Sequence, residues 1–223
     1  MSRNSPQEAR TSAGKTERPR ERLVAAAGDL FWRLGIRGVG VEAVAEAAHT
    51  NKMTLYRHFA SKDALVAEWL RRLTEADFAG WARLEALHPG DPAAQLLAWI
   101  DVVEHWLATS GARGCPYANS LAELPDPAHP ARQVIKAHKT RQRRHFADLL
   151  RRIEPASADV LADELFFLVE GARASAHGIG MADVPKQFGR VARALVGRAV
   201  SGTGNKAAAG RRRRPPPPSS GNA

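Results

Sequence analysis

The side chains best suited to chemistry lie between Lys52 and Lys62, in the run KMTLYRHFASK. Leu55 and Phe59 stand four residues apart, so a helix through this run would turn both toward a core and leave the other side chains outside. Those others include ammonium, guanidinium, imidazole, phenol and hydroxyl groups, which donate hydrogen bonds to phosphate oxygens and base edges. The predicted nucleic-acid contacts are Lys52, Met53, Thr54, Tyr56, Arg57, His58 and Lys62.

A second short helix is predicted directly before this one, over residues 41–48. Val41, Val44, Ala45 and Ala48 fall on one face at helical spacing. The following His-Thr-Asn breaks the pattern, and Asn51 suits an N-cap because its side-chain oxygen can accept from a free amide of the next turn. Two short helices joined by such a turn fit the helix-turn-helix motif, whose second helix enters the major groove of DNA.

In this region the chain resembles the TetR family of transcriptional repressors. The match is close from about Arg20 to Leu70, and beyond that only the helical pattern and the length agree. The run TLY.HF.SK.AL is far more specific to the family than a bare helix-turn-helix pattern. The resembling residues are Leu34, Gly35, Val44, Ala45, Lys52, Thr54, Leu55, Tyr56, His58, Phe59, Ser61 and Lys62.

Three residues depart from the family's pattern. Gly40 stands where Ser or Thr usually caps the second helix, so that cap loses its side-chain acceptor. His49 stands where the turn usually has Gly; if that position needs a positive φ, His tolerates it better than a β-branched residue would. Met53 replaces a common Gly at the start of the recognition helix. These changes bear on which bases are read.

The resemblance also implies roles for single residues. The family positions that match Tyr56 and Lys62 usually reach phosphates, which positions the protein without reading sequence. Thr54, Met53 and Arg57 are the expected base readers, because methyl groups pack on thymine and guanidinium pairs with guanine edges. For His58 two roles stay open, since it could donate to a phosphate or remain beside Phe59.

Charge is unevenly placed along the 223 residues. The formal net charge is +10, of which Lys206 and the four arginines of the RRRRPPPP segment supply half. Residues 18–72 hold ten basic and six acidic side chains, so most of the remaining excess falls on the predicted DNA-binding part. The start, MSRNSPQEAR, is no secretory signal, and no apolar run approaches the ~18 residues of a membrane span. We therefore expect a cytoplasmic protein without a membrane partner.

The pattern predicts an all-α fold of about nine helices. We expect a disordered leader at 1–18, a three-helix DNA-binding domain at 19–66, a helical ligand-binding and dimerisation domain at 67–201, and a disordered basic tail at 202–223. The leader or the tail could add contacts to DNA or remain plain solvated chain. The predicted helices are 19–34, 41–48, 52–59, a helix from Ser61 to about 87, one opening at Asp91 and Pro92, at best a short one at 117–123, and then 131–153, 157–177 and 184–200.

The resemblance implies a homodimer and an effector site in the carboxy-terminal domain. The helices predicted at 157–177 and 184–200 would form a four-helix bundle with those of a second subunit, or else close the core of one chain. A twofold dimer would let one short recognition helix read two half-sites of a palindromic operator. A small molecule in an apolar cavity would then release the DNA. The residues expected to line this cavity could equally be plain core. They are Trp99, Val103, Trp106, Tyr117, Asn119, Phe166, Phe167 and Glu170, with Glu123 as a further polar group.

Nothing in the sequence marks an enzyme, a metal site or a cofactor. The single Cys115 can form no intramolecular disulfide; it is either a thiol sensor or inert. His138 and His145 stand two turns apart on a helix face expected to be charged, without metal spacing. Glu170 is expected to line the cavity, to point to solvent or to pair with Arg173. The alternatives to a ligand-responsive repressor are a helical adaptor that binds only protein, or an enzyme built around Cys115, His129 and Glu123.

Overall fold

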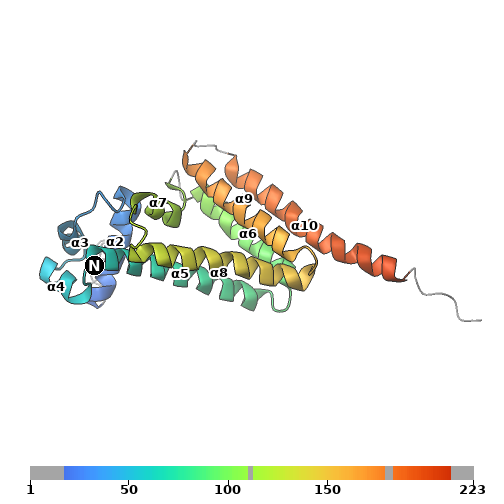
Figure 1. Ribbon diagram of the computed structural model, residues 1–223, viewed down its shortest axis with the longest axis horizontal. Helices are drawn as coiled ribbons and strands as arrows, with labels where there is room; N and C mark the ends of the chain where they lie inside the picture. Colours follow the sequence, from blue (N-terminus) through green and yellow to red (C-terminus); the bar gives the residue numbers. More distant parts are fainter. Residues whose placement is uncertain (1–17, 110–112, 179–182, 212–223) are drawn as a thin grey trace, which may run out of the picture. The chain divides into compact units, whose positions relative to one another are not determined.

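The computed structural model describes residues 18–109, 113–178 and 183–211, and all regular structure in these ranges is helical (Figure 1). The all-α prediction is therefore confirmed for the described chain. The helices are α2 (Pro19–Leu34), α3 (Val41–Ala47), α4 (Lys52–His58), α5 (Lys62–Leu87), α6 (Pro92–Thr109), α7 (Pro116–Glu123), α8 (Pro130–Ile153), α9 (Ala158–Gly178) and α10 (Val184–Arg211).

Helix ends follow the predicted capping residues. Pro19 opens α2, and Gly35 closes it with a φ of 79°, a conformation that glycine adopts without strain. The Ser61 hydroxyl accepts from the Ala64 amide at 3.1 Å before α5. The Asp91 carboxylate accepts from the Ala94 amide at 2.9 Å and so caps α6. Short-range capping chemistry thus sets where these helices begin and end.

The carboxy-terminal helix is longer than predicted. We expected the chain to be unfolded from Gly202 onward, but α10 continues to Arg211. Lys206 and the three alanines that follow it have high helix propensity, which explains the continuation. The polyproline run that also motivated the prediction, and the predicted leader up to residue 17, lie outside the described residues.

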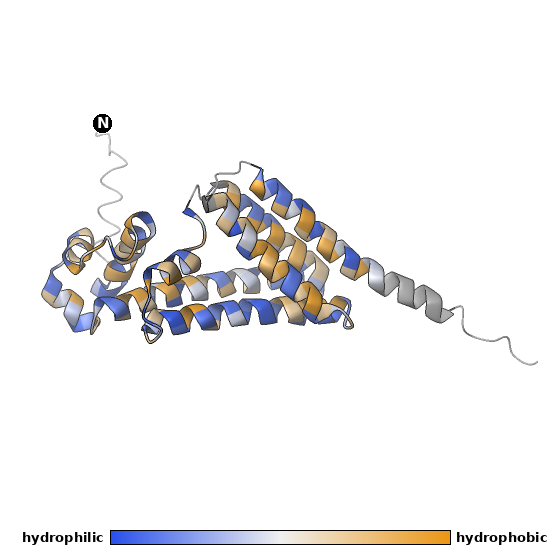
Figure 2. Ribbon diagram, turned by 45° about the horizontal axis from the view of Figure 1, so that its top comes forward, coloured by the Kyte–Doolittle hydropathy of each residue, from blue (hydrophilic) through white to orange (hydrophobic). Residues whose placement is uncertain are grey.

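The chain divides into two compact units. Unit 1 comprises the residues up to Gly80 and a second stretch, Arg113–Thr140; unit 2 comprises Trp81–Ala112 and the residues from Arg141 onward. Helices α5 and α8 each pass through both units. The alternation of apolar and polar residues along each helix can be followed in Figure 2.

One hydrophobic core holds unit 1 together, and both stretches contribute to it. Helices α2, α3 and α4 contribute Leu23, Val44 and Leu55, which are all buried. The second stretch adds Leu124 and Ile135 to the same cluster. Since apolar burial is roughly additive in area, the helix-turn-helix here depends on residues from later in the chain as well as on its own.

Ion pairs join α2 to α5 within unit 1. The Glu68 carboxylate accepts from the Arg20 guanidinium at 2.7 Å, from Arg72 at 3.3 Å and from Arg71. Partial burial would raise the pKa of Glu68, but the arginines, Arg20 first, outweigh that effect and hold the pKa below its ordinary value. This carboxylate therefore stays ionised and ties the amino-terminal end of α2 to α5.

The core of unit 2 is aromatic. The Trp81 and Trp99 rings stack at 5.4 Å with an interplanar angle of 13°, and Phe146 meets both edge-on. Helix α10 packs on α6 and on α9 (Figure 1). The His145 ring lies 4.3 Å from Trp81, and burial lowers the pKa of His145.

The two histidines of α8 do not lie on a charged face, so that expectation is wrong. His138 is 2% exposed, and its ring stacks on Tyr117 at 3.9 Å. His145 is half-buried against Trp81. The prediction failed because both histidines were counted as charged residues in the helical pattern. A neutral imidazole can pack against other rings as an apolar ring does, so these positions belong to the buried face of the helix.

Candidate nucleic-acid interface

The turn between α3 and α4 requires a positive φ at His49. His49 has a φ of 51°, a left-handed conformation for which glycine is the usual choice and which His tolerates. Its amide donates to the Glu46 carbonyl at 2.9 Å, and the Thr50 amide donates to Ala45 at 2.9 Å. Gly40 precedes α3 without a side-chain cap, as expected from the missing Ser or Thr.

Asn51 starts the recognition helix. Its side-chain oxygen accepts from the Thr54 amide at 2.9 Å, which confirms the predicted N-cap. Leu55 and Phe59 then fix the inner side of α4, since both are buried and both belong to the core of unit 1. The Arg20 guanidinium covers the Phe59 ring at 5.3 Å from its centre. The helix is therefore held at its start and along its inner face.

We expect Asn51→Ala to lower the free energy of unfolding by about 1 kcal/mol, because the Thr54 amide loses its acceptor. Denaturant unfolding at fixed protein concentration would measure this loss. Asn51→Ser retains a side-chain acceptor and is the matched control. An equal loss in both variants would contradict the capping role.

The outer side of α4 carries the predicted DNA contacts. Lys52, Arg57 and His58 are exposed, Met53 is 78% exposed and Tyr56 is 46% exposed. Thr54 is half-buried beside the cap. The helix thus presents cationic, phenolic and apolar groups on one exposed surface, while its apolar anchors face inward. Six of the predicted residues are brought together in this way: Lys52, Met53, Thr54, Tyr56, Arg57 and His58.

Lys52 is already oriented by neighbours in the helix-turn-helix. Its Nζ donates to the Glu42 carboxylate of α3 at 2.6 Å and lies 6.0 Å from the centre of the Tyr56 ring. The hydrogen bond lowers the pKa of Glu42 and raises the pKa of Lys52. Both side chains are exposed, so a phosphate can compete with Glu42 for the ammonium.

Lys62 has a partner that sequence reasoning missed. Its Nζ donates to the Ile36 carbonyl at 2.6 Å, and the side chain is half-buried. An ammonium has three donor hydrogens, so this bond leaves two for a phosphate. Lys62 therefore also ties the start of α5 to the loop between α2 and α3.

The predicted effector-site residues are divided between the two units. Trp99, Val103, Trp106, Phe166, Phe167 and Glu170 belong to unit 2, whereas Tyr117 and Asn119 belong to unit 1. In unit 1 both polar groups form hydrogen bonds. The Tyr117 hydroxyl donates to Asp77 at 2.9 Å, and the Asn119 side-chain Nδ2 donates to the Arg113 carbonyl at 2.5 Å. Burial, followed by the nearby Asp77 charge, raises the pKa of Tyr117 well above its ordinary value.

In unit 2 the predicted lining residues range from buried to exposed, with Trp106, Phe166 and Glu170 half-buried. Trp99 and Val103 are buried among other side chains, and Phe167 is 69% exposed. The Glu170 carboxylate lies 3.7 Å from the Arg173 guanidinium, which in turn lies 5.4 Å from the centre of the Trp106 ring. Of the three expectations for Glu170, the structure shows the pair with Arg173.

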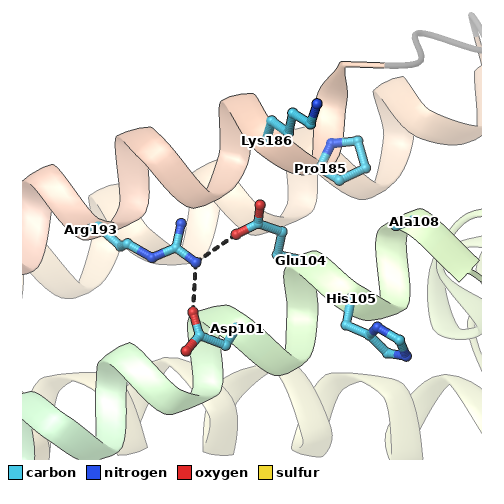
Figure 3. A pocket seen from close by; sticks show the side chains of 7 residues that line it. All are labelled: Asp101, Glu104, His105, Ala108, Pro185, Lys186 and Arg193. Carbon is cyan, nitrogen blue, oxygen red and sulfur yellow. Dashed lines mark hydrogen bonds and ion pairs between the residues drawn. The ribbon is translucent and has the colours of Figure 1, made fainter.

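Two surface hollows in unit 2 are lined by other residues. One, of about 450 Å³, lies between α6 and α10 (Figure 3), where Arg193 donates to Asp101 and to Glu104 at 2.6 Å each. These hydrogen bonds raise the pKa of Arg193. The other, of about 470 Å³ and mostly apolar, lies between α9 and α10 and is lined by Glu164, Leu168, Val191, Ala194, Leu195 and Arg198.

Cys115, His129 and Glu123, the residues of the alternative enzyme site, each contact a different partner. The Cys115 sulfur lies 3.7 Å from Lys139 Nζ, His129 Nε2 lies 3.2 Å from an Asp63 oxygen, and Glu123 accepts from the Arg37 amide. Among the described residues, no group of three or more His, Cys, Asp or Glu could hold a metal ion. No helix of the described chain is long and apolar enough to cross a membrane.

Comparison with known proteins assigns the chain to a family. The family model for bacterial regulatory proteins of the tetR family matches residues 23–69, which span α2, α3, α4 and the first part of α5. A search of curated proteins found no significant match. Solved structures resemble the chain over most of its length.

A putative TetR transcriptional regulator from Streptomyces avermitilis is 34% identical, with 82% of this chain and 98% of that chain covered and a TM-score of 0.71. A TetR-family transcriptional regulator from Streptomyces coelicolor is 26% identical, with 82% and 96% covered and a TM-score of 0.75. The reduced form of E. coli NemR, 20% identical with 78% and 95% covered, shares the fold at a TM-score of 0.70. With its capped recognition helix and these similarities, the chain belongs to the TetR family of bacterial transcriptional regulators.

Proposed function

We propose that this regulator is a repressor that binds a palindromic DNA operator as a dimer and is released by a small-molecule effector. The observation that carries the proposal is the exposed surface of α4, where Lys52, Met53, Tyr56, Arg57 and His58 stand above a buried, capped helix. We assign DNA contact to residues 19–66 and effector binding and dimerisation to 67–201. Such a protein would act in the bacterial cytoplasm, where its DNA is.

The proposed contacts on α4 and at the start of α5 divide into contacts to phosphate and contacts to bases. Tyr56, Lys52 and Lys62 are the phosphate ligands, because a phenol and two ammonium groups bind anions without reading sequence. Met53, Thr54 and Arg57 are the base readers. Met53 is the most exposed of the large apolar side chains in the described chain, and its flexible thioether suits contact with a thymine methyl.

The outer faces of α9 and α10 support the proposed dimer. Val160 and Phe167 on α9 are 62% and 69% exposed, and Val191 on α10 is 42% exposed. Val191 also lines the apolar hollow between the two helices. Large apolar side chains gathered on adjacent helices are costly in water, and a second copy of the same two helices would cover them in a twofold four-helix bundle.

Effector and operator are proposed to bind different arrangements of the dimer. Each then weakens the binding of the other by the same factor, since coupling between two binding sites is reciprocal. The proposed effector site is the predicted set around Trp99, Trp106, Phe166 and Glu170. Because Trp99 packs against Trp81 and Phe146 in this structure, a ligand there would have to displace aromatic contacts.

Selection of bound fragments from random duplex DNA tests the proposal. We expect a palindromic site and a binding constant that falls steeply as salt is added, because phosphate contacts release counterions. A protein that ignores duplexes even in dilute salt would refute DNA binding. A selected site without twofold symmetry would refute the dimeric mode while leaving DNA binding intact.

We expect Arg57→Ala to reduce discrimination at one operator base pair by about 1–3 kcal/mol, because a guanidinium paired with guanine edges is lost. Tyr56→Phe removes only a hydroxyl, so it should weaken binding to operator and scrambled duplex by the same factor. Titrations of both variants against the operator and its single-base substitutions would check this. A changed base preference in Tyr56→Phe would contradict the division of roles.

A further inference from the structure

The loop between α2 and α3 is held by a carboxylate from far along the chain. Glu123, at the end of α7, accepts from the Arg37 amide at 2.8 Å. A Cβ on Gly35 would lie 3.0 Å from both Glu123 oxygens, so glycine at this position lets the carboxylate approach. Gly35 to Gly40 joins α2 to α3, and Glu123 therefore holds the chain directly before the helix-turn-helix.

An arginine from the same stretch holds the end of α2. Arg113 Nη1 donates to the Trp32 carbonyl at 2.6 Å and to the Arg33 carbonyl. The last carbonyls of a helix have no partner within it, and a cation there is favourable for the helix dipole. Asn119 donates to the Arg113 carbonyl at 2.5 Å and so fixes the backbone that carries this arginine.

The stretch that carries Arg113 and Glu123 is itself firmly anchored in unit 1. The Tyr117 hydroxyl donates to Asp77 of α5 at 2.9 Å, and the Tyr117 ring stacks on His138 of α8. Leu124 and Ala131 are buried in the same core as the recognition helix. The groups that bond the end of α2 and the α2–α3 loop thus come from a stretch that is anchored in the core of unit 1.

A third contact reaches the start of α5, directly after the recognition helix. His129 Nδ1 accepts from the Ala131 amide at 3.1 Å, which orients the ring, and its Nε2 lies 3.2 Å from an Asp63 oxygen. On the other side of the α2–α3 loop, Lys62 donates to the Ile36 carbonyl. Contacts from residues 113–131 therefore bracket the helix-turn-helix both before α3 and after α4.

We infer that Arg113 and Glu123 are positioning residues for DNA recognition, which fix the α2–α3 loop and through it the placement of α3 and α4. The inference rests on the proposed operator binding. Glu123, which its polarity had suggested for the effector, is bound to the backbone beside the DNA-binding helices. The role is specific to recognition, since base contacts depend on helix placement more steeply than phosphate contacts from long side chains do.

The test compares Glu123→Ala with Ile135→Val, a substitution in the same core that touches none of these loop contacts. Both variants would be titrated with the operator selected by the wild-type protein and with a scrambled duplex. Glu123→Ala is expected to weaken operator binding about tenfold, as loss of one charge-assisted hydrogen bond allows, and scrambled binding by less than about twofold. Glu123→Gln keeps an acceptor for the Arg37 amide and should restore operator binding to within about threefold.

If Glu123 had only a general structural role, its substitution would not weaken operator binding selectively. Operator binding unchanged in Glu123→Ala, or weakened as much in Ile135→Val at matched melting temperatures, would overturn the inference. If Glu123→Ala does not fold, Arg113→Met decides, because Arg113 is exposed and its replacement leaves the core intact. Unchanged operator binding in Arg113→Met would then overturn the inference.

Hydrogen exchange separates failure of this inference from failure of the proposed function. The Arg37 amide should exchange faster in Glu123→Ala than in Glu123→Gln, with no DNA present. Equal exchange in the two variants would refute the support by Glu123. If the wild-type protein binds no duplex at all, the proposed function fails, and the exchange result still reports on the support.

Discussion

Phe167→Asp is expected to convert the protein to monomers and to weaken its binding to a palindromic operator by more than about 100-fold. Phe167 is 69% exposed on α9 and stands one heptad from the equally unprotected Val160. In the proposed bundle both would be covered by the partner subunit. An aspartate there would place an unpaired carboxylate in an apolar interface, which is strongly unfavourable.

Analytical ultracentrifugation and operator titration would measure the two parts of this result. Val102→Asp is the matched control, because Val102 is 56% exposed on α6, a helix that is not part of the proposed bundle. It should remain dimeric and bind the operator normally. A dimeric Phe167→Asp, or a Val102→Asp protein that dissociates as readily, would show that the outer face of α9 is not the interface.

Phe146→Ala is expected to lower the free energy of unfolding by about 3–5 kcal/mol, the range for an aromatic side chain removed from a core. Phe146 is 0% exposed, and its ring meets Trp99 at 4.7 Å and Trp81 at 6.0 Å. The substitution removes both edge contacts and leaves a cavity beside two stacked indoles. The stack itself should loosen as a consequence.

Denaturant unfolding followed by tryptophan fluorescence would detect this loss, with protein concentration held fixed because the proposed dimerisation would contribute to stability. Leu87→Ala is the control: Leu87 is 71% exposed at the end of α5, and its truncation should change the free energy by less than about 0.5 kcal/mol. A small effect of Phe146→Ala would mean that the aromatic core readjusts to fill the space.

The recognition helix could be predicted from sequence because everything that defines it is local. The Asn51 side-chain oxygen accepts from the Thr54 amide only three residues later, and Leu55 and Phe59 are separated by one turn. The family's usual glycine at the position of His49 raised the question of a positive φ there, and the structure answers it with a φ of 51°. Capping and periodicity act within a few residues, so they can be inferred without the fold.

The support of the α2–α3 loop could not be predicted, because its partners are distant in sequence. Glu123 and Arg37 are separated by 86 positions, and nothing near either residue indicates the other. The same limit explains why Glu123 and Asn119 were predicted at an effector site. Their polarity was visible in the sequence, but their hydrogen-bond partners were not. This limit also explains why Lys62 was expected only at a phosphate, since its carbonyl partner, Ile36, lies across a loop and two short helices.

Unit 1 is assembled from two separated stretches of chain, and this has a consequence for protein engineering. A chimera that joins residues 18–80 alone to the effector-binding domain of another regulator would lack Leu124, Ala131 and Ile135. The hydrophobic core that supports the helix-turn-helix would then be incomplete. A chimera should therefore carry residues 113–140 as well. The chimera would then keep the operator preference together with the contacts that residues 113–140 make to the helix-turn-helix.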